Sequence, residues 1–284
     1  MAKFFTILFI SVIWILEVSA QKSHITTGYH SGSLIVIGGG RLGDEIMNEF
    51  KVLAGGDAAK IVIIPTANVI DDKIDTARVK ARFERHGFTD ITIMHTSDPA
   101  VANTDNFIKP LKDATGIFFS GGRQWRIADG FLNTKAQDEM YKLLDRGGVI
   151  AGSSAGATIQ GSYLARGDSK NNQIMMGDHE VGLGFITNIA IDQHVLARNR
   201  QFDMFDILKK LPHLLGIGID ENTAIVVNAG TFKVIGASLV TIYDNTFWSR
   251  EGSELKHLPP SNALFYFLRR GDKYDLTKRI VIED

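Results

Sequence analysis

The residue whose setting most favours chemistry is Ser154, at the centre of Gly152-Ser153-Ser154-Ala155-Gly156. This pentapeptide fits the pattern G-x-S-x-G, which forms a nucleophile elbow when a strand precedes it and a helix follows. The apolar run Val149–Ala151 predicts the end of a buried strand, and residues 155–164 are compatible with a helix. Ser154 would then stand on a sharp turn at a helix N-terminus. The alternative is a βα loop that only turns the chain or holds a phosphate.

A hydroxyl nucleophile needs a base hydrogen-bonded to it and an acid that orients the base. Among the eight histidines, His194 is the best candidate base, because it follows a short buried strand predicted at Ile189–Ile191. Glu221 follows another predicted strand, Leu215–Ile219, and is our choice for the acid. Asp168, in a polar loop between elements, is the rival candidate for that role.

The elements that must position these residues alternate between strand and helix. Apolar runs predict strands at residues 34–37, 60–64, 91–94 and 116–119, and periodicity predicts helices at residues 44–53, 72–86, 135–145 and 201–211. This alternation predicts an α/β fold, a three-layer, doubly wound and mostly parallel sheet with its ligands at the carboxyl edge of the strands. Without an internal repeat or linker, residues 21–284 are predicted to form a single domain.

The amino-acid composition excludes several classes of function. Lys plus Arg number 31 against 32 for Asp plus Glu, so the net charge of −1 offers no support for binding nucleic acid or an anionic membrane. The chain of 284 residues contains no cysteine, which removes thiol nucleophiles, disulfides and thiolate metal sites. A covalent mechanism would therefore use Ser, Thr, Lys or a carboxylate.

The N-terminus predicts export. Lys3 precedes the apolar run Phe4–Leu16, and Val18-Ser19-Ala20 ends in small residues. We therefore expect residues 1–20 to be a signal peptide cleaved before Gln21, and the mature protein to be secreted or periplasmic and free of the membrane. The alternative is an uncleaved anchor.

A glycine-rich turn at residues 38–43 formally matches the dinucleotide pattern G-x-G-x-x-G. A dinucleotide site also needs an acidic residue at the end of the next strand, but residues 60–64 run into Pro65-Thr66-Ala67. The sequence therefore favours a tight turn between strand and helix over an NAD site.

Several motifs together resemble the cyanophycinase and aspartyl-dipeptidase family of serine peptidases, in order and in spacing, from about residue 33 to residue 244. The motifs are Gly38–Gly40, Ser120–Gln124, Gly152–Ala157, Ile191–His194 with Arg198 and Arg200, and Gly216–Ala224. The resemblance implies a fold like the class I glutamine amidotransferases, with serine in place of their cysteine. It also implies an aspartyl peptide as substrate, no metal or organic cofactor, and a possible homodimer.

The resemblance assigns roles residue by residue. It makes Ser154 the nucleophile, His194 the base and either Glu221 or Asp168 the acid. The oxyanion would be held by backbone N–H groups of Gly121, Gly122 and Ala155. The substrate would be bound by Gln124, Asp192, Gln193, Arg198 and Arg200.

Two departures from the cyanophycinase pattern bear on the substrate. Arg123 stands where that pattern has an aspartate, and Asp203 stands where it has a further arginine. Cyanophycin, with its β-Asp-Arg units, and an α-aspartyl dipeptide therefore both remain candidate substrates. A third possibility is a non-catalytic protein that binds acidic peptides through Arg198 and Arg200.

Overall fold

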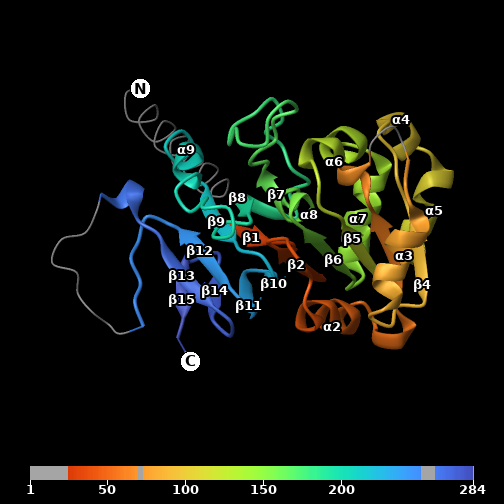
Figure 1. Ribbon diagram of the computed structural model, residues 1–284, viewed down its shortest axis with the longest axis horizontal. Coiled ribbons are helices and arrows are strands. Elements are labelled where there is room, and N and C mark those ends of the chain that lie inside the picture. The colour runs from red at the N-terminus through yellow and green to blue at the C-terminus, as the bar shows by residue number, and fades with distance from the viewer. Residues whose placement is uncertain (1–24, 70–72, 251–259, 284) are drawn as a thin grey trace, which may run out of the picture.

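Nine strands form the larger of two sheets in the computed structural model, which describes residues 25–69, 73–250 and 260–283 (Figure 1). In spatial order they are β15 (Ile280–Ile282), β14 (Lys273–Asp275), β11 (Thr231–Gly236), β10 (Thr223–Asn228), β2 (Ser33–Ile37), β6 (Val149–Ser153), β5 (Gly116–Phe119), β3 (Lys60–Ile64) and β4 (Asp90–Ile93). The predicted signal peptide, residues 1–20, lies outside the described residues.

The half of this sheet from β2 to β4 is parallel, and the half from β10 to β15 is antiparallel. β2 pairs with β6 so that Ile37 lies opposite Ser153. The two strands therefore end at the same edge, and the turn that carries Ser154 begins beside the glycine turn after Ile37.

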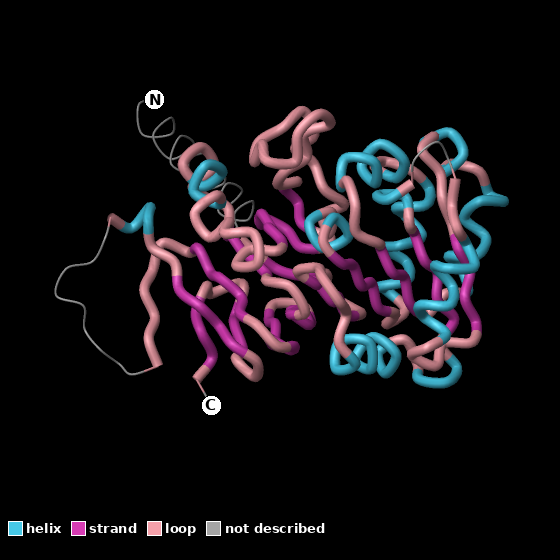
Figure 2. The backbone as a smooth tube through the Cα atoms, in the orientation of Figure 1, coloured by secondary structure: helices cyan, strands magenta, loops and turns pink. Residues whose placement is uncertain are grey.

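Helices cover both faces of the parallel half (Figure 2). On one face, Phe50 of α2 (Asp44–Leu53) and Phe83 of α3 (Thr76–Glu84) pack in a cluster with Ile35. On the other face, residues of α5 (Asp105–Asp113) and α7 (Lys135–Asp145) belong to one apolar cluster with Leu34 and Val36. Successive strand residues thus enter opposite cores, which is why the strands are apolar throughout. The predicted three-layer, doubly wound α/β class is confirmed.

The remaining α-helices of the described chain are shorter. They are α4 (Pro99–Ala102), α6 (Gln124–Phe131), α8 (Ala155–Thr158) and α9 (Met204–Leu208). In the described ranges no helix has the length and apolarity needed to cross a bilayer.

A second sheet lies beside the first. Its strands run in the order β1 (Thr27–Gly28), β8 (Ile186–Gln193), β9 (Leu215–Ile219), β12 (Leu239–Tyr243) and β13 (Tyr266–Arg269), with β7 (Gly161–Tyr163) also paired to β8. Ile191 and Ile217 of this sheet share one apolar cluster with Leu34 and Val36 of the larger sheet. The two sheets are therefore packed together, and the strands that precede His194 and Glu221 belong to the second one.

The predicted helix bounds at residues 44–53 and 135–145 are confirmed, whereas the helix predicted over residues 155–164 is wrong beyond Thr158. The chain turns instead into β7, because pairing with β8 satisfies the backbone there and overrides a weak helix preference. The helix predicted at residues 72–86 begins only at Thr76, where the Asp75 carboxylate caps it by accepting from the Arg78 N–H.

Candidate active site

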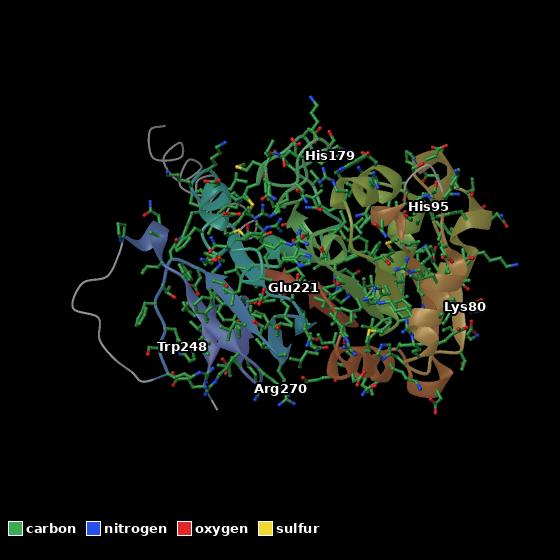
Figure 3. The ribbon with its side chains drawn as sticks, viewed as in Figure 1. Lys80, His95, His179, Glu221, Trp248 and Arg270 are labelled. Atoms are coloured by element: carbon green, nitrogen blue, oxygen red, sulfur yellow. The ribbon has the colours of Figure 1, made fainter. Side chains whose placement is uncertain are left out.

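Three polar side chains form a hydrogen-bonded chain where the two sheets meet. Ser154 Oγ lies 2.8 Å from His194 Nε2, and His194 Nδ1 lies 2.6 Å from Glu221 Oε1. A carboxylate accepts from Nδ1–H, which leaves Nε2 as the acceptor for the serine O–H. The arrangement is that of an activated hydroxyl nucleophile. Figure 3 shows Glu221 near the middle of the molecule.

Ser154 stands on a sharp turn between β6 and α8. Its backbone has φ 57° and ψ −112°, outside the ordinary regions for a residue with a side chain. The flanking glycines allow strand and helix to approach, since a Cβ on Gly152 would overlap the carbonyl oxygen of Gly156. The G-x-S-x-G pattern therefore forms the strand–turn–helix that its spacing predicts, although the helix is only four residues long.

The carboxyl end of β2 is hydrogen-bonded to the three chain segments that carry the nucleophile, the base and the acid. The carbonyl of Ile37 accepts from the Ser154 N–H at 2.9 Å, and the carbonyl of Gly38 accepts from the His194 N–H at 2.9 Å. The next carbonyl, Gly39, accepts from the N–H of Asn222, the neighbour of Glu221, at 3.0 Å. Three consecutive carbonyls of one strand end thus fix the backbone behind nucleophile, base and acid.

Glycine is required where this strand end passes the side chains. Gly39 has φ +115°, and a Cβ there would overlap the imidazole of His194. Gly40 has φ +70°, and a Cβ there would lie 2.6 Å from Glu221 Oε2. The glycine turn therefore does more than connect the strand to the helix. Its backbone also packs directly against the imidazole of His194 and the carboxylate of Glu221.

The environment of His194 keeps its imidazole neutral. Burial lowers the pKa of His194, and the positive charges of Arg198 and Arg200 lower it further, against the hydrogen bond and charge of Glu221, which raise it. The net pKa lies below the ordinary value of 6.5. At neutral pH the ring is therefore able to accept the proton of Ser154.

Backbone amides beside Ser154 are available to stabilise an anion. Gly121 lies against the nucleophile, since a Cβ there would be 3.2 Å from Ser154 Cβ. The neighbouring amides of Ser120 and Arg123 donate to carbonyls of Ile64 and Ala67. Within the described chain, the N–H groups of Gly121 and Gly122 have no such internal acceptor. This geometry is compatible with the predicted oxyanion hole of Gly121, Gly122 and Ala155.

Asp168 does not meet the imidazole. Its carboxylate accepts from the backbone N–H groups of Lys170 and Asn171, at 2.9 and 2.7 Å, and so closes a turn of its own loop. Its backbone carbonyl accepts from Arg123 Nη2 at 3.5 Å. Of the two candidate acids, the structure brings Glu221 to His194.

The residues expected to bind substrate are mostly bonded within the protein. Gln124 Nε2 donates to the carbonyls of Ala165 and Arg166, both at 2.8 Å. Arg200 Nη1 donates to the backbone oxygen and to Oε1 of Gln193. Arg198 differs from these residues, because its side chain is exposed while its charge acts on His194. The contact of Gln124, Gln193 and Arg200 with substrate stays a prediction. In the structure, Gln124 and Arg200 bind backbone carbonyls, and the side chain of Gln193 accepts from Arg200.

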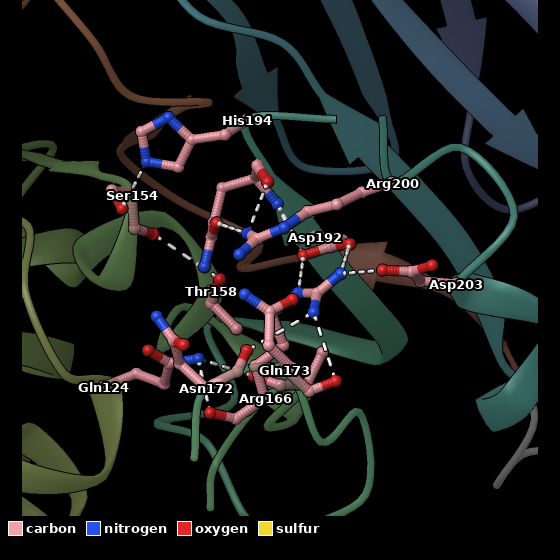
Figure 4. A network of polar contacts seen from close by, with 12 residues as sticks. Gln124, Ser154, Thr158, Arg166, Asn172, Gln173, Asp192, His194, Arg200 and Asp203 are labelled. Atoms are coloured by element: carbon pink, nitrogen blue, oxygen red, sulfur yellow. Dashed lines mark hydrogen bonds and ion pairs between the residues drawn. The ribbon is translucent and has the colours of Figure 1, made fainter. Parts of the chain in front are cut away.

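Asp192, also predicted to bind substrate, lies in a buried ionic network (Figure 4). Arg166, only 1% exposed, donates to both Asp192 oxygens at 2.7 and 2.9 Å and to Asp203 Oδ2 at 2.5 Å. Its Nη1 also donates to the carbonyls of Asn172 and Gln173. Asp203, one of the two departures noted in the sequence, is therefore paired with a guanidinium from the chain itself.

A cavity of about 510 Å³ opens at the nucleophile, and its lining includes Ser154, His194 and Gly121. Residues of α3 and of the segment before it also line this cavity, among them Lys73, Arg78 and Arg82, which the sequence motifs did not indicate. Arg78 and Arg82 are four residues apart on a predicted helix, and residues so spaced share one face of the helix. This spacing could have predicted that the two cations lie together.

Over most of its length the chain is similar to known peptidases. The sequence profile of peptidase family S51 matches residues 12–235. The cyanophycinase of Geminocystis herdmanii is 31% identical over 260 residues, covering 87% of this chain and 94% of that protein. The cyanophycinase of Trichormus variabilis is 31% identical over 271 residues, covering 88% of this chain and 87% of that protein.

A solved structure supports the same relationship. The crystal structure of a peptidase from an acI-B1 actinobacterium matches this fold with a TM-score of 0.64 and 26% sequence identity. The match covers 87% of this chain and 98% of that one.

The account of His194 makes a prediction that needs no substrate. Replacing Arg198 with Gln removes a positive charge that disfavours the imidazolium, so the pKa of His194 should rise. An NMR titration of the His194 ring would measure the shift, with Lys80→Gln as the matched loss of a distant positive charge. An unchanged or lowered pKa in Arg198→Gln would contradict the electrostatic account.

Proposed function

Because the chain belongs to peptidase family S51 and is a serine-type peptidase, we propose that it hydrolyses aspartyl peptide bonds with Ser154 as nucleophile, His194 as base and Glu221 as acid. The observation that carries the proposal is the hydrogen-bonded chain from Ser154 Oγ through the imidazole to Glu221. The sequence similarity to cyanophycinases over most of the chain supports an aspartyl residue in the substrate.

In this mechanism the Ser154 hydroxyl attacks the carbonyl carbon of the scissile bond while His194 Nε2 takes its proton. Glu221 holds the ring through Nδ1 and stabilises the imidazolium. The negative oxygen of the tetrahedral intermediate accepts from the N–H groups of Gly121, Gly122 and Ala155, each donor typically contributing about 3 kcal/mol.

Collapse of that intermediate breaks the carbon–nitrogen bond. His194 returns its proton to the leaving amine, and the aspartyl group remains as an ester on Ser154. Water then attacks the ester with His194 again as base, which releases the acid and restores the hydroxyl. The exposed guanidinium of Arg198, beside His194, is the cation best situated to pair with the aspartyl carboxylate.

The first test is turnover. Residues 21–284 are incubated with cyanophycin and with α- and β-aspartyl dipeptides, and released amines are quantified. We expect at least one of these substrates to be cut, and Ser154→Ala to lower the rate about 10⁴-fold or more. Circular dichroism of Ser154→Ala checks that the fold is retained. Binding of these peptides without turnover, or turnover that survives in Ser154→Ala, would contradict the proposal.

The second test separates the two candidate acids. Glu221→Gln keeps the size of the side chain but loses the charge that stabilises the imidazolium, so kcat should fall about 10³-fold or more. Asp168→Asn is the matched change in the rival residue, and it should alter kcat only a few-fold, since Asp168 closes a turn in its own loop. The reverse order of these two losses would assign the acid to Asp168.

A further inference from the structure

The cavity in front of Ser154 has a positively charged wall, which we call the α3 wall and define as Lys73, Arg78 and Arg82. It shares the cavity of about 510 Å³ with Ser154 and His194. A substrate whose scissile carbonyl sits at Ser154 would therefore extend a neighbouring group toward these cations.

The positive charge of the α3 wall is only partly offset by the described part of the chain, because three cations face one carboxylate in the cavity lining. Among the described residues that line the cavity, Asp75 is the only carboxylate, and it is engaged in capping α3 through the Arg78 backbone N–H. No ion pair joins Lys73, Arg78 or Arg82 to a carboxylate within the described ranges. Desolvation, together with the like charge of Arg85, lowers the pKa of Arg82, as expected for a cation without its anion.

The remaining lining of the cavity is partly apolar. Val69, Val79 and Phe118 contribute apolar surface to it, while Lys73, Arg78 and Arg82 are exposed to solvent. A cleft lined by charges of one sign attracts groups of the opposite charge and repels groups of the same charge. The cavity should therefore favour a carboxylate and disfavour an ammonium or guanidinium group.

Two acidic groups of the second sheet and the segment after it are already paired with a cation of the chain itself. Arg166 binds Asp192 through two hydrogen bonds and Asp203 through a third (Figure 4), and Arg166 and Asp192 are buried whereas Asp203 is 36% exposed. A substrate guanidinium would have to displace Arg166 to pair with Asp192, which would leave a buried charge without its partner. Asp192 thus gives no advantage to an arginine-containing peptide.

Two separate cationic groups therefore lie near the catalytic residues, because the charge of Arg198 acts on His194 while the α3 wall lines the cavity that contains Ser154. We propose that the α3 wall is a carboxylate-binding subsite that selects aspartyl peptides with a second acidic side chain across the scissile bond. This proposal rests on the proposed function, with Arg198 pairing with the aspartyl carboxylate and the α3 wall pairing with the next residue. Guanidinium groups suit that task, since they bind carboxylates through paired N–H groups.

The experiment compares three C-terminally amidated dipeptides, Asp-Glu, Asp-Gln and Asp-Lys, in which only the second side chain changes charge. We expect kcat/KM to be about tenfold or more higher for Asp-Glu than for Asp-Gln, and lowest for Asp-Lys. The triple variant Lys73→Gln, Arg78→Gln, Arg82→Gln should abolish the preference for Asp-Glu and leave kcat/KM for Asp-Gln within a few-fold. Lys80→Gln should retain the preference, because Lys80 lies on the same helix (Figure 3) but does not line the cavity.

Equal turnover of the three peptides by the unaltered protein would overturn the subsite while leaving the proposed function intact. An equal loss for Asp-Glu and Asp-Gln in the triple variant would also overturn it, because the α3 wall would then serve the aspartyl residue itself. If no peptide is cut, calorimetry with Ser154→Ala decides. Tighter binding of Asp-Glu than of Asp-Lys, lost in the triple variant, supports the subsite, and equal binding overturns it.

Discussion

A row of three backbone carbonyls, at residues 37–39, is the constraint on which the site depends. Each accepts a hydrogen bond from a different segment, so that Ser154, His194 and the turn of Glu221 are tied to one strand end. The nucleophile comes from the larger sheet, while the base follows a strand of the second sheet. Because the apolar cluster shared by the sheets fixes their relative position, the side chains meet at 2.8 and 2.6 Å without a long flexible connection.

The same arrangement controls the charge of the base. Burial and the neighbouring arginines lower the pKa of His194, while Glu221 opposes them. Glu221 is 39% exposed, so solvent screens part of its effect on the ring, and burial is the larger influence on the pKa. A neutral imidazole held by a carboxylate is the state that a general base requires. The geometry and the electrostatics therefore favour the same chemistry.

Local sequence features predicted the parts of the site that local structure determines. The apolar strand and the glycines around Ser154 predicted the turn, and the bounds of helices α2 and α7 followed from the periodicity of their apolar residues. Long-range features could not be read in this way. The shortness of α8 depends on strand pairing with β8, and the packing of Gly39 against His194 joins residues far apart in the chain. Likewise, nothing near Arg166 in the sequence indicates that it neutralises two distant aspartates.

The central claim is that Ser154 is activated by His194, and covalent labelling tests it most directly. The purified protein is treated with a fluorophosphonate, and the modified peptide is identified by mass spectrometry. The account predicts an adduct on Ser154 that forms far more slowly in His194→Ala. Absence of that adduct, or equal labelling in the variant, would contradict it.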